Sequence, residues 1–95
     1  MYKIILDEEF KKNIKRFDAM RQKLILKKVY LLKDNPDRPS LRTEKLFKGT
    51  KNEVRSSSVS MGVRLIWKLE GNIIYIKDVG GHDIYRKYKF KKKNQ

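Results

Sequence analysis

The chain contains no cysteine, a single histidine and only two prolines in 95 residues. Without cysteine it has no disulfides and no thiolate metal sites, and one histidine does not suffice for a zinc site. No apolar run approaches the roughly 20 residues that span a bilayer. The apolar start is followed at once by Asp7, Glu8 and Glu9, which is not the layout of a signal peptide. We therefore expect a cytoplasmic protein with no metal, no other cofactor and no membrane contact.

Acidic residues are also scarce. Asp and Glu number 11 against 25 Lys and Arg, which gives a formal net charge of +14. On so short a chain this charge attracts phosphates or an acidic protein, and solubility alone rarely requires it. The length suits one small domain. We place that domain at residues 1–90 and a basic tail at 91–95.

The first third of the chain predicts one strand and two helices. Residues 2–6 alternate as a strand, and Asp7 is a candidate N-cap for the helix that follows. Two helical stripes then appear, formed by Phe10, Ile14 and Phe17 and by Ile25, Val29 and Leu32. One helix over residues 8–33 would be about 39 Å long, too long for a compact chain of this size. We therefore expect a break near residues 18–21.

The remainder predicts strands: a weak one at 41–46, a polar one at 53–59, and a hairpin at 63–79 that turns at Gly71-Asn72. Pairing Glu70 with Ile73 sets Ile66 opposite Lys77 and Arg64 opposite Val79. One face of the hairpin is then apolar, with Val63, Leu65, Trp67, Leu69, Ile74 and Ile76, and the other carries Arg64, Ile66, Lys68, Tyr75 and Lys77. This pattern predicts an α+β fold, with two N-terminal helices packed on one face of a mainly antiparallel, four- to five-stranded twisted sheet.

Three side chains are candidates for chemistry. His82 follows two glycines in the stretch VGGHDIYRKYKF, where it is either a solvated histidine or a proton carrier oriented by its neighbours. Glu44 either balances local positive charge or acts as a general base. Arg64 is either a solvated arginine on the free face of the sheet or a clamp for a phosphate. The serines at 56–58 are expected to be polar strand residues, whereas Tyr88 and Phe90 could stack on RNA bases.

These segments, LRTEKL at 41–46 and RSSSVSMGVRLIWKLEGNIIYIKDVGGHDIY at 55–85, resemble the RelE/ParE toxin superfamily of bacterial toxin–antitoxin systems. The resemblance extends from residue 1 to about residue 88. It implies a metal-independent ribonuclease that cuts messenger RNA, usually at the ribosome, through attack of a ribose 2′-hydroxyl on the adjacent phosphate. The implied roles are Glu44 as base, Arg64 as stabiliser of the transition state and His82 as donor to the leaving oxygen, with Tyr85 in support.

The chain departs from the family pattern in its third strand. Arg55 stands where related toxins often have tryptophan, and Ser57 and Ser58 stand where arginines often follow. Phosphate contacts must then come from other basic residues. Those expected to bind RNA are Arg42, Lys45, Lys48, Lys51, Arg55, Lys68 and Lys87.

Three functions therefore remain open. The first is a messenger RNA endoribonuclease, which the joint presence of Glu44, Arg64 and His82 favours. The second is a protein of the same superfamily that inhibits DNA gyrase and cuts no RNA. The third is a non-toxic RNA-binding module, which composition alone would permit. For either toxin we expect an acidic antitoxin as partner, and for the nuclease messenger RNA and the ribosome as well.

Overall fold

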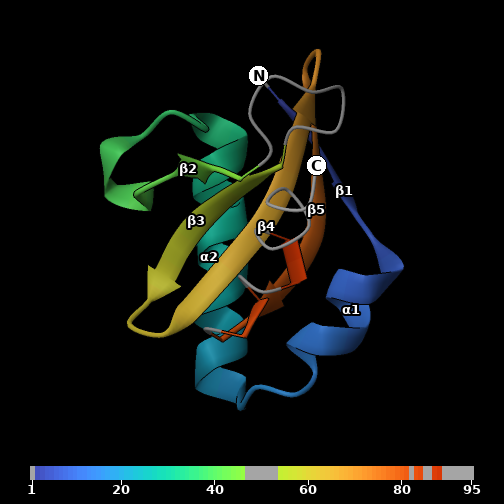
Figure 1. Ribbon diagram of the computed structural model, residues 1–95, viewed down its shortest axis with the longest axis vertical. Helices are drawn as coiled ribbons and strands as arrows, with labels where there is room; N and C mark the ends of the chain where they lie inside the picture. Colours follow the sequence, from blue (N-terminus) through green and yellow to red (C-terminus); the bar gives the residue numbers. More distant parts are fainter. Residues whose placement is uncertain (1, 47–53, 82, 85–86, 89–95) are drawn as a thin grey trace.

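The computed structural model describes residues 2–46, 54–81, 83, 84, 87 and 88. Along the chain the elements are β1 (Lys3–Leu6), α1 (Glu8–Ile14), α2 (Ala19–Asp34), the 3₁₀ helix η1 (Pro39–Leu41), β2 (Glu44–Lys45), β3 (Arg55–Ser60), β4 (Val63–Glu70) and β5 (Ile73–Gly80). The strands form one sheet in the order β1-β5-β4-β3-β2 (Figure 1). Only the β1–β5 pair is parallel. The predicted α+β architecture is confirmed.

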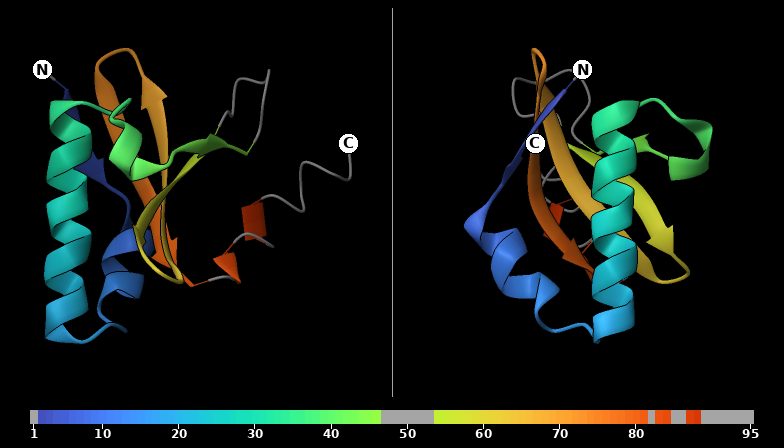
Figure 2. Two further views of the ribbon diagram at one scale, coloured as in Figure 1. Left: turned by 90° about the vertical axis from the view of Figure 1, so that its left-hand side faces the viewer. Right: turned by 180° about the vertical axis from the view of Figure 1, so that it is seen from behind.

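Both helices lie on one side of the sheet, and the described residues of the C-terminal segment, 83, 84, 87 and 88, lie on the other (Figure 2). The predicted division into two helices is confirmed, but the break lies earlier than the expected residues 18–21, because α1 ends at Ile14 and α2 begins at Ala19. Asp18 caps α2, since its carboxylate accepts a hydrogen bond of 2.8 Å from the Arg21 amide. Asp7 occupies the predicted N-cap position of α1 but makes no side-chain capping bond there; its carboxylate pairs with Lys77 at 2.9 Å.

The helices and the sheet enclose the main core. Both predicted helical stripes face it, and it contains the predicted apolar face of the hairpin around the fully buried Trp67. The pattern of alternating apolar residues therefore identified the side of the sheet that the helices cover. Among the described residues, no helix is long and apolar enough to cross a membrane.

The register of the β4–β5 hairpin was predicted correctly near its turn and wrongly beyond it. Glu70 pairs with Ile73 and Lys68 with Tyr75 as expected, but Ile66 pairs with Asp78 and Arg64 with Gly80. Lys77 is the extra residue of a β-bulge between these regions. If side chains alternated without a bulge after Ile74 and Ile76, Asp78 would point into the main core and Val79 would point away from it. The bulge reverses both, because it shifts the register by one residue.

A second, smaller core lies on the other side of the sheet. It consists of Leu46, Val54, Ile66 and Ile84, with Tyr88 packed against it. Ile66 was predicted on an exposed basic face, but it is fully buried. The reason is that the C-terminal segment, through Ile84 and Tyr88, covers this part of the sheet.

The strands at the β2 edge are shorter than predicted. The expected strand at 41–46 reduces to Glu44–Lys45, because Leu41 closes the 3₁₀ helix η1 instead. The polar strand expected at 53–59 is β3, which spans Arg55–Ser60. Residue 53 lies outside the described residues.

Candidate functional site

Cross-strand pairing brings two of the predicted catalytic residues to the same face of the sheet. We call the face that packs against α1 and α2 the helix face and the opposite one the outer face. Glu44 pairs with Ser56, which pairs with Ile66, so all three share the outer face. Arg64 pairs with Ser58 and stands two residues from Ile66 in β4, and it shares that face.

The distance between Glu44 and Arg64 follows from sheet geometry. Two strand spacings and one two-residue step separate them, which is roughly 12 Å between their Cα atoms. Glu44 is exposed and Arg64 is half-buried. Ser56, between them in the sheet, is fully buried, and Ser58, the partner of Arg64, is half-buried. This arrangement can hold a phosphate with a base on one side and a cation on the other.

The predicted residues His82, Tyr85, Lys48 and Lys51 lie outside the described residues. Gly80 and Gly81 are the two glycines that precede His82. Neither glycine has a positive φ. A Cβ at Gly80 would approach Ile84 Cδ1 closely, at 3.3 Å, whereas one at Gly81, where the backbone bends, would lie at about van der Waals distance from the Gly62 carbonyl oxygen, at 3.4 Å.

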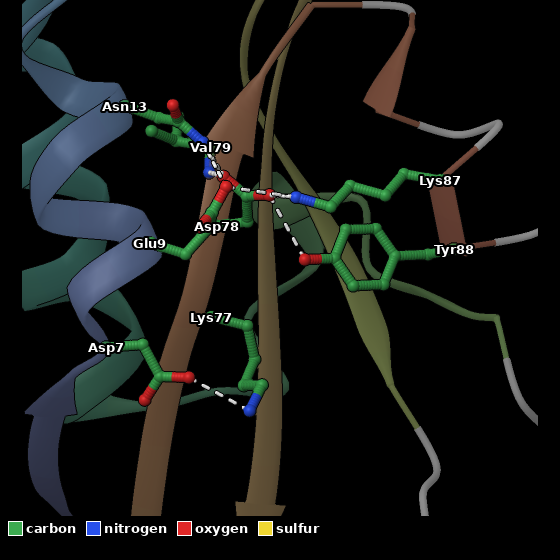
Figure 3. Close-up of polar contacts among 8 residues, drawn as sticks. All are labelled: Asp7, Glu9, Asn13, Lys77, Asp78, Val79, Lys87 and Tyr88. Atoms are coloured by element: carbon green, nitrogen blue, oxygen red, sulfur yellow. Dashed lines mark hydrogen bonds and ion pairs between the residues drawn. The ribbon is translucent and has the colours of Figure 1, made fainter.

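Asp78 fixes the start of the C-terminal segment, and the sequence analysis did not identify it. Its side chain is 1% exposed. Oδ1 accepts hydrogen bonds from Asn13 Nδ2 at 2.7 Å and from the Val79 amide at 2.8 Å. Oδ2 accepts from Lys87 Nζ at 3.0 Å and from the Tyr88 hydroxyl at 3.1 Å. Figure 3 shows that this carboxylate joins α1, β5 and the C-terminal segment.

The protonation of the partners follows from this network. Burial alone lowers the pKa of Lys87, but the hydrogen bonds and charges of Asp78 and Glu9 outweigh it, so the pKa is raised. The hydrogen bond from Lys87, together with its charge, lowers the pKa of Glu9. Burial raises the pKa of Tyr88, and the charge and hydrogen bond of Asp78 raise it further. The Lys87 cation and the neutral Tyr88 phenol are therefore the stable forms at neutral pH.

Lys87 and Tyr88 both make contacts within the folded chain. Lys87 was predicted to bind RNA, and its ammonium contacts Asp78 and also Glu9, at 3.2 Å. Tyr88 was expected to stack on bases, but its ring packs against the second core. Lys68, also expected to bind RNA, lies on the outer face. Its Nζ forms a salt bridge of 2.8 Å with Glu70 Oε2.

A cleft of about 380 Å³ lies beside this network. Asn13 of α1 lines it together with Arg16 and Phe17 of the turn that follows α1, and the remaining lining residues are Asp78–Gly81, Asp83, Ile84 and Lys87. The residues on both sides of position 82 therefore line a hollow that is large enough for a small polar group.

The other predicted RNA-binding residues lie elsewhere. Lys45 pairs with Arg55, which pairs with Trp67, and this places them on the helix face. Together with Arg42 they line a different cleft. The structure thus divides the predicted site between the two faces of the sheet, with Glu44, Arg64 and Lys68 on one and Lys45 and Arg55 on the other.

Solved structures of other proteins share this fold, although neither a protein-family model nor a curated protein sequence matches the chain. A chain of the archaeal RelE–RelB complex from Pyrococcus horikoshii has a TM-score of 0.71 at 17% identity, over 84% of this chain and 93% of that one. YafQ from E. coli has a TM-score of 0.68 at 21% identity, over 88% and 97%. A metal-bound toxin from Helicobacter pylori has a TM-score of 0.68 at 24% identity, over 88% and 98%. The chain therefore has the fold of RelE-like toxins.

Proposed function

We propose that this chain, which has the RelE-like toxin fold, is a toxin that cuts messenger RNA on the ribosome and so stops translation in the cytoplasm. The observation that carries the proposal is the position of Glu44 and Arg64 on one face of the sheet, two strands apart. The sequence resemblance assigns the base and the transition-state stabiliser to these same two residues. A RelE-like fold supports a toxin, and this pair supports a nuclease in particular.

The proposed reaction is a transphosphorylation that needs two proton carriers and one cation. Glu44 takes the proton from a ribose 2′-hydroxyl, and the oxygen attacks the adjacent phosphorus. The bond between phosphorus and the 5′-oxygen then breaks, and His82 donates a proton to that oxygen, with Tyr85 in support. The products are a 2′,3′-cyclic phosphate and a 5′-hydroxyl. Arg64 stabilises the charge that develops on the phosphate oxygens in the transition state.

The roles of His82 and Tyr85 in this proposal rest on the resemblance alone. The network around Asp78 supports them indirectly, because it anchors residues on both sides of position 82. Anchoring residues 79, 87 and 88 limits the positions open to the chain between them, which lowers the entropic cost of placing a catalytic group there. No metal takes part in the proposed reaction.

We also propose an acidic antitoxin as the partner. The formal charge of +14 favours fast, salt-sensitive association with an acidic chain. Two of the similar structures are complexes of a toxin with an antitoxin, RelE with RelB and YafQ with DinJ. The solvent-exposed side of α2, which points away from the sheet, carries lysines and exposed apolar side chains, namely Met20, Leu24, Leu26 and Tyr30. An acidic segment that carries apolar residues complements such a surface.

The test is cleavage of ribosome-bound messenger RNA by purified parental chain and by variants. We expect Glu44→Gln, Arg64→Ala and His82→Ala each to slow cleavage by about 10²–10⁴-fold and to relieve growth arrest on expression. The matched control is Glu8→Gln, which changes an exposed carboxylate of α1 that pairs with Lys11, and this variant should cleave RNA at the parental rate.

Two results would decide for another function. If the parental chain leaves RNA intact and inhibits supercoiling by purified gyrase, the gyrase-directed alternative holds. If it binds RNA and its expression does not arrest growth, the chain is an RNA-binding module.

A further inference from the structure

A basic cleft lies at the β2 edge of the sheet, apart from the proposed catalytic residues. Its volume is about 330 Å³, and it is lined by Asp37, Arg38, Pro39, Arg42, Thr43, Lys45 and Arg55. Four of these residues are cations and one is an anion. We call it the edge cleft. Because Lys45 and Arg55 belong to the helix face, this cleft opens on the side of the sheet away from Glu44 and Arg64.

Two residues that line the edge cleft, Arg55 and Thr43, are linked by contacts to the buried core. The Arg55 guanidinium lies 5.3 Å from the centroid of the Trp67 ring, which is fully buried. The Trp67 Nε1 donates a hydrogen bond of 2.9 Å to Ser57 Oγ, and the hydroxyls of Ser57 and Thr43 are 2.7 Å apart. This chain of hydrogen bonds connects the core to a residue that lines the cleft. Arg55 and Thr43 are therefore held in place before any ligand binds.

The rim of the edge cleft has an unusual backbone. Arg42 adopts a left-handed conformation with φ 48° and ψ 52°, and no other described residue except glycine has a positive φ. Such a conformation is unfavourable for a residue with a Cβ and occurs preferentially at functional sites. Arg38 beside it is held by Asp34 at 2.7 Å, and its Nε is buried without a hydrogen-bond partner among the described residues.

We infer that the edge cleft binds a phosphate group of a single RNA strand. Three arginines and a lysine from the loop before η1, its C-cap, β2 and β3 line one small hollow. A phosphate is tetrahedral and accepts donors from several directions, whereas a carboxylate accepts them mainly in one plane. The four cations therefore match a phosphate better than an acidic side chain.

The position of the cleft indicates how RNA would run. Glu44 and Lys45 are neighbours in β2 but point to opposite faces of the sheet. β2 is the edge strand, so an RNA strand that passes around this edge contacts the outer face with one nucleotide and the edge cleft with another. The inference rests on the proposed function for the identity of the RNA, but binding at this cleft does not require cleavage.

The experiment measures binding without cleavage. A fluorescent oligoribonucleotide with 2′-O-methyl groups throughout has no nucleophile, so its anisotropy reports binding by the full chain. We expect the double variant Arg42→Gln with Lys45→Gln to bind at least 10-fold more weakly. We also expect its slope of log affinity against log salt to become shallower by about 0.7 for each lost phosphate contact. Inorganic phosphate should compete with the oligonucleotide on the parental chain and much less on this variant.

The matched control is Lys23→Gln with Lys27→Gln, which removes the same charge from the exposed surface of α2. It should bind nearly as the parental chain does. If both double variants lose RNA affinity equally, binding depends on the overall charge of the chain, and the edge cleft is not a specific site. Unchanged binding by the cleft variant would also overturn the inference. So would a cleft variant that keeps its affinity for RNA and loses affinity for poly-L-glutamate, because the occupant would then be an acidic protein.

A failure of the proposed nuclease activity can be told apart from a failure of RNA binding at the edge cleft. A parental chain that binds the 2′-O-methyl RNA through the edge cleft but cuts no messenger RNA contradicts the proposed reaction and leaves this inference intact.

Discussion

Tyr88 donates a hydrogen bond of 3.1 Å to Asp78, ten residues earlier in the chain. Asp78 is buried at the end of β5, and the Tyr88 ring packs against the second core on the outer face. This contact, together with the one from Lys87, joins the bulged strand to residues of the segment that covers the sheet. Because the residues between them include His82, the strength of this contact bears directly on the proposed site.

Removing the charge of Asp78 should destabilise the fold. Asp78→Asn keeps the shape of the side chain, but its amide places donors where Lys87 and Tyr88 donate now. We expect a loss of about 2–3 kcal/mol in the free energy of unfolding, less than for a fully buried pair, since the Lys87 side chain is 48% exposed. Urea denaturation measures this. Asp83→Asn, an exposed carboxylate in the same segment, should change it by less than about 0.5 kcal/mol.

The same contact predicts a pH dependence. Because the pKa of Tyr88 is raised in the folded protein, its stabilising effect is complete below the unfolded value of 10.0 and is lost as the pH rises above it. The parental chain should therefore exceed Tyr88→Phe in stability by about 1–2 kcal/mol at pH 8. This difference should shrink above pH 10. Urea midpoints of both chains from pH 8 to 11 test it, and a difference that stays constant would contradict the proposed contact.

Ser57 should matter for stability and not for chemistry. Ser57→Ala leaves the buried Nε1 of Trp67 without its acceptor, which costs about 1–3 kcal/mol. Ser58→Ala, the next residue and on the outer face, should change the free energy of unfolding by less than about 0.5 kcal/mol. Thermal denaturation separates the two. A loss of RNA cleavage in a folded Ser57→Ala chain would show that the serine has a chemical role that we do not assign to it.

The strained backbone at Arg42 predicts opposite effects on stability and binding. Arg42→Gly relieves the left-handed conformation and should raise the free energy of unfolding by up to about 1 kcal/mol. It should at the same time weaken binding of 2′-O-methyl RNA. Lys45→Gly is the control, because an ordinary strand residue loses stability on this change. A destabilised Arg42→Gly chain would contradict the assignment of strain.

Local periodicity was sufficient to predict most of the fold. Alternation around Trp67 identified the buried side of the hairpin, and the two helical stripes identified what covers it. The size of the chain predicted that a break divides the two helices, but not its position, which lies between Ile14 and Ala19. These features depend on residues close in sequence, which is why pattern alone revealed them.

The bulge and the second core depend on contacts between distant residues. Asp78 is the one acidic residue in a strand of apolar and basic neighbours, and strict alternation would have placed it in the main core. That conflict was visible in the sequence and could have indicated the bulge. Burial of Ile66 could not be foreseen, because it depends on where the C-terminal segment packs. The division of the basic residues between two faces likewise followed only from the observed register of β2.

The chemistry of cleavage is the central claim, and one substrate tests it most directly. The parental chain is given ribosome-bound messenger RNA whose cleavage position is already mapped, with a single 2′-deoxynucleotide on the 5′ side of the scissile phosphate. Without the 2′-hydroxyl there is no nucleophile for Glu44 to activate, so we predict no cut at that position and unchanged cuts elsewhere. Continued cleavage at the deoxy position, or products without a 2′,3′-cyclic phosphate at the other positions, would contradict the proposed mechanism.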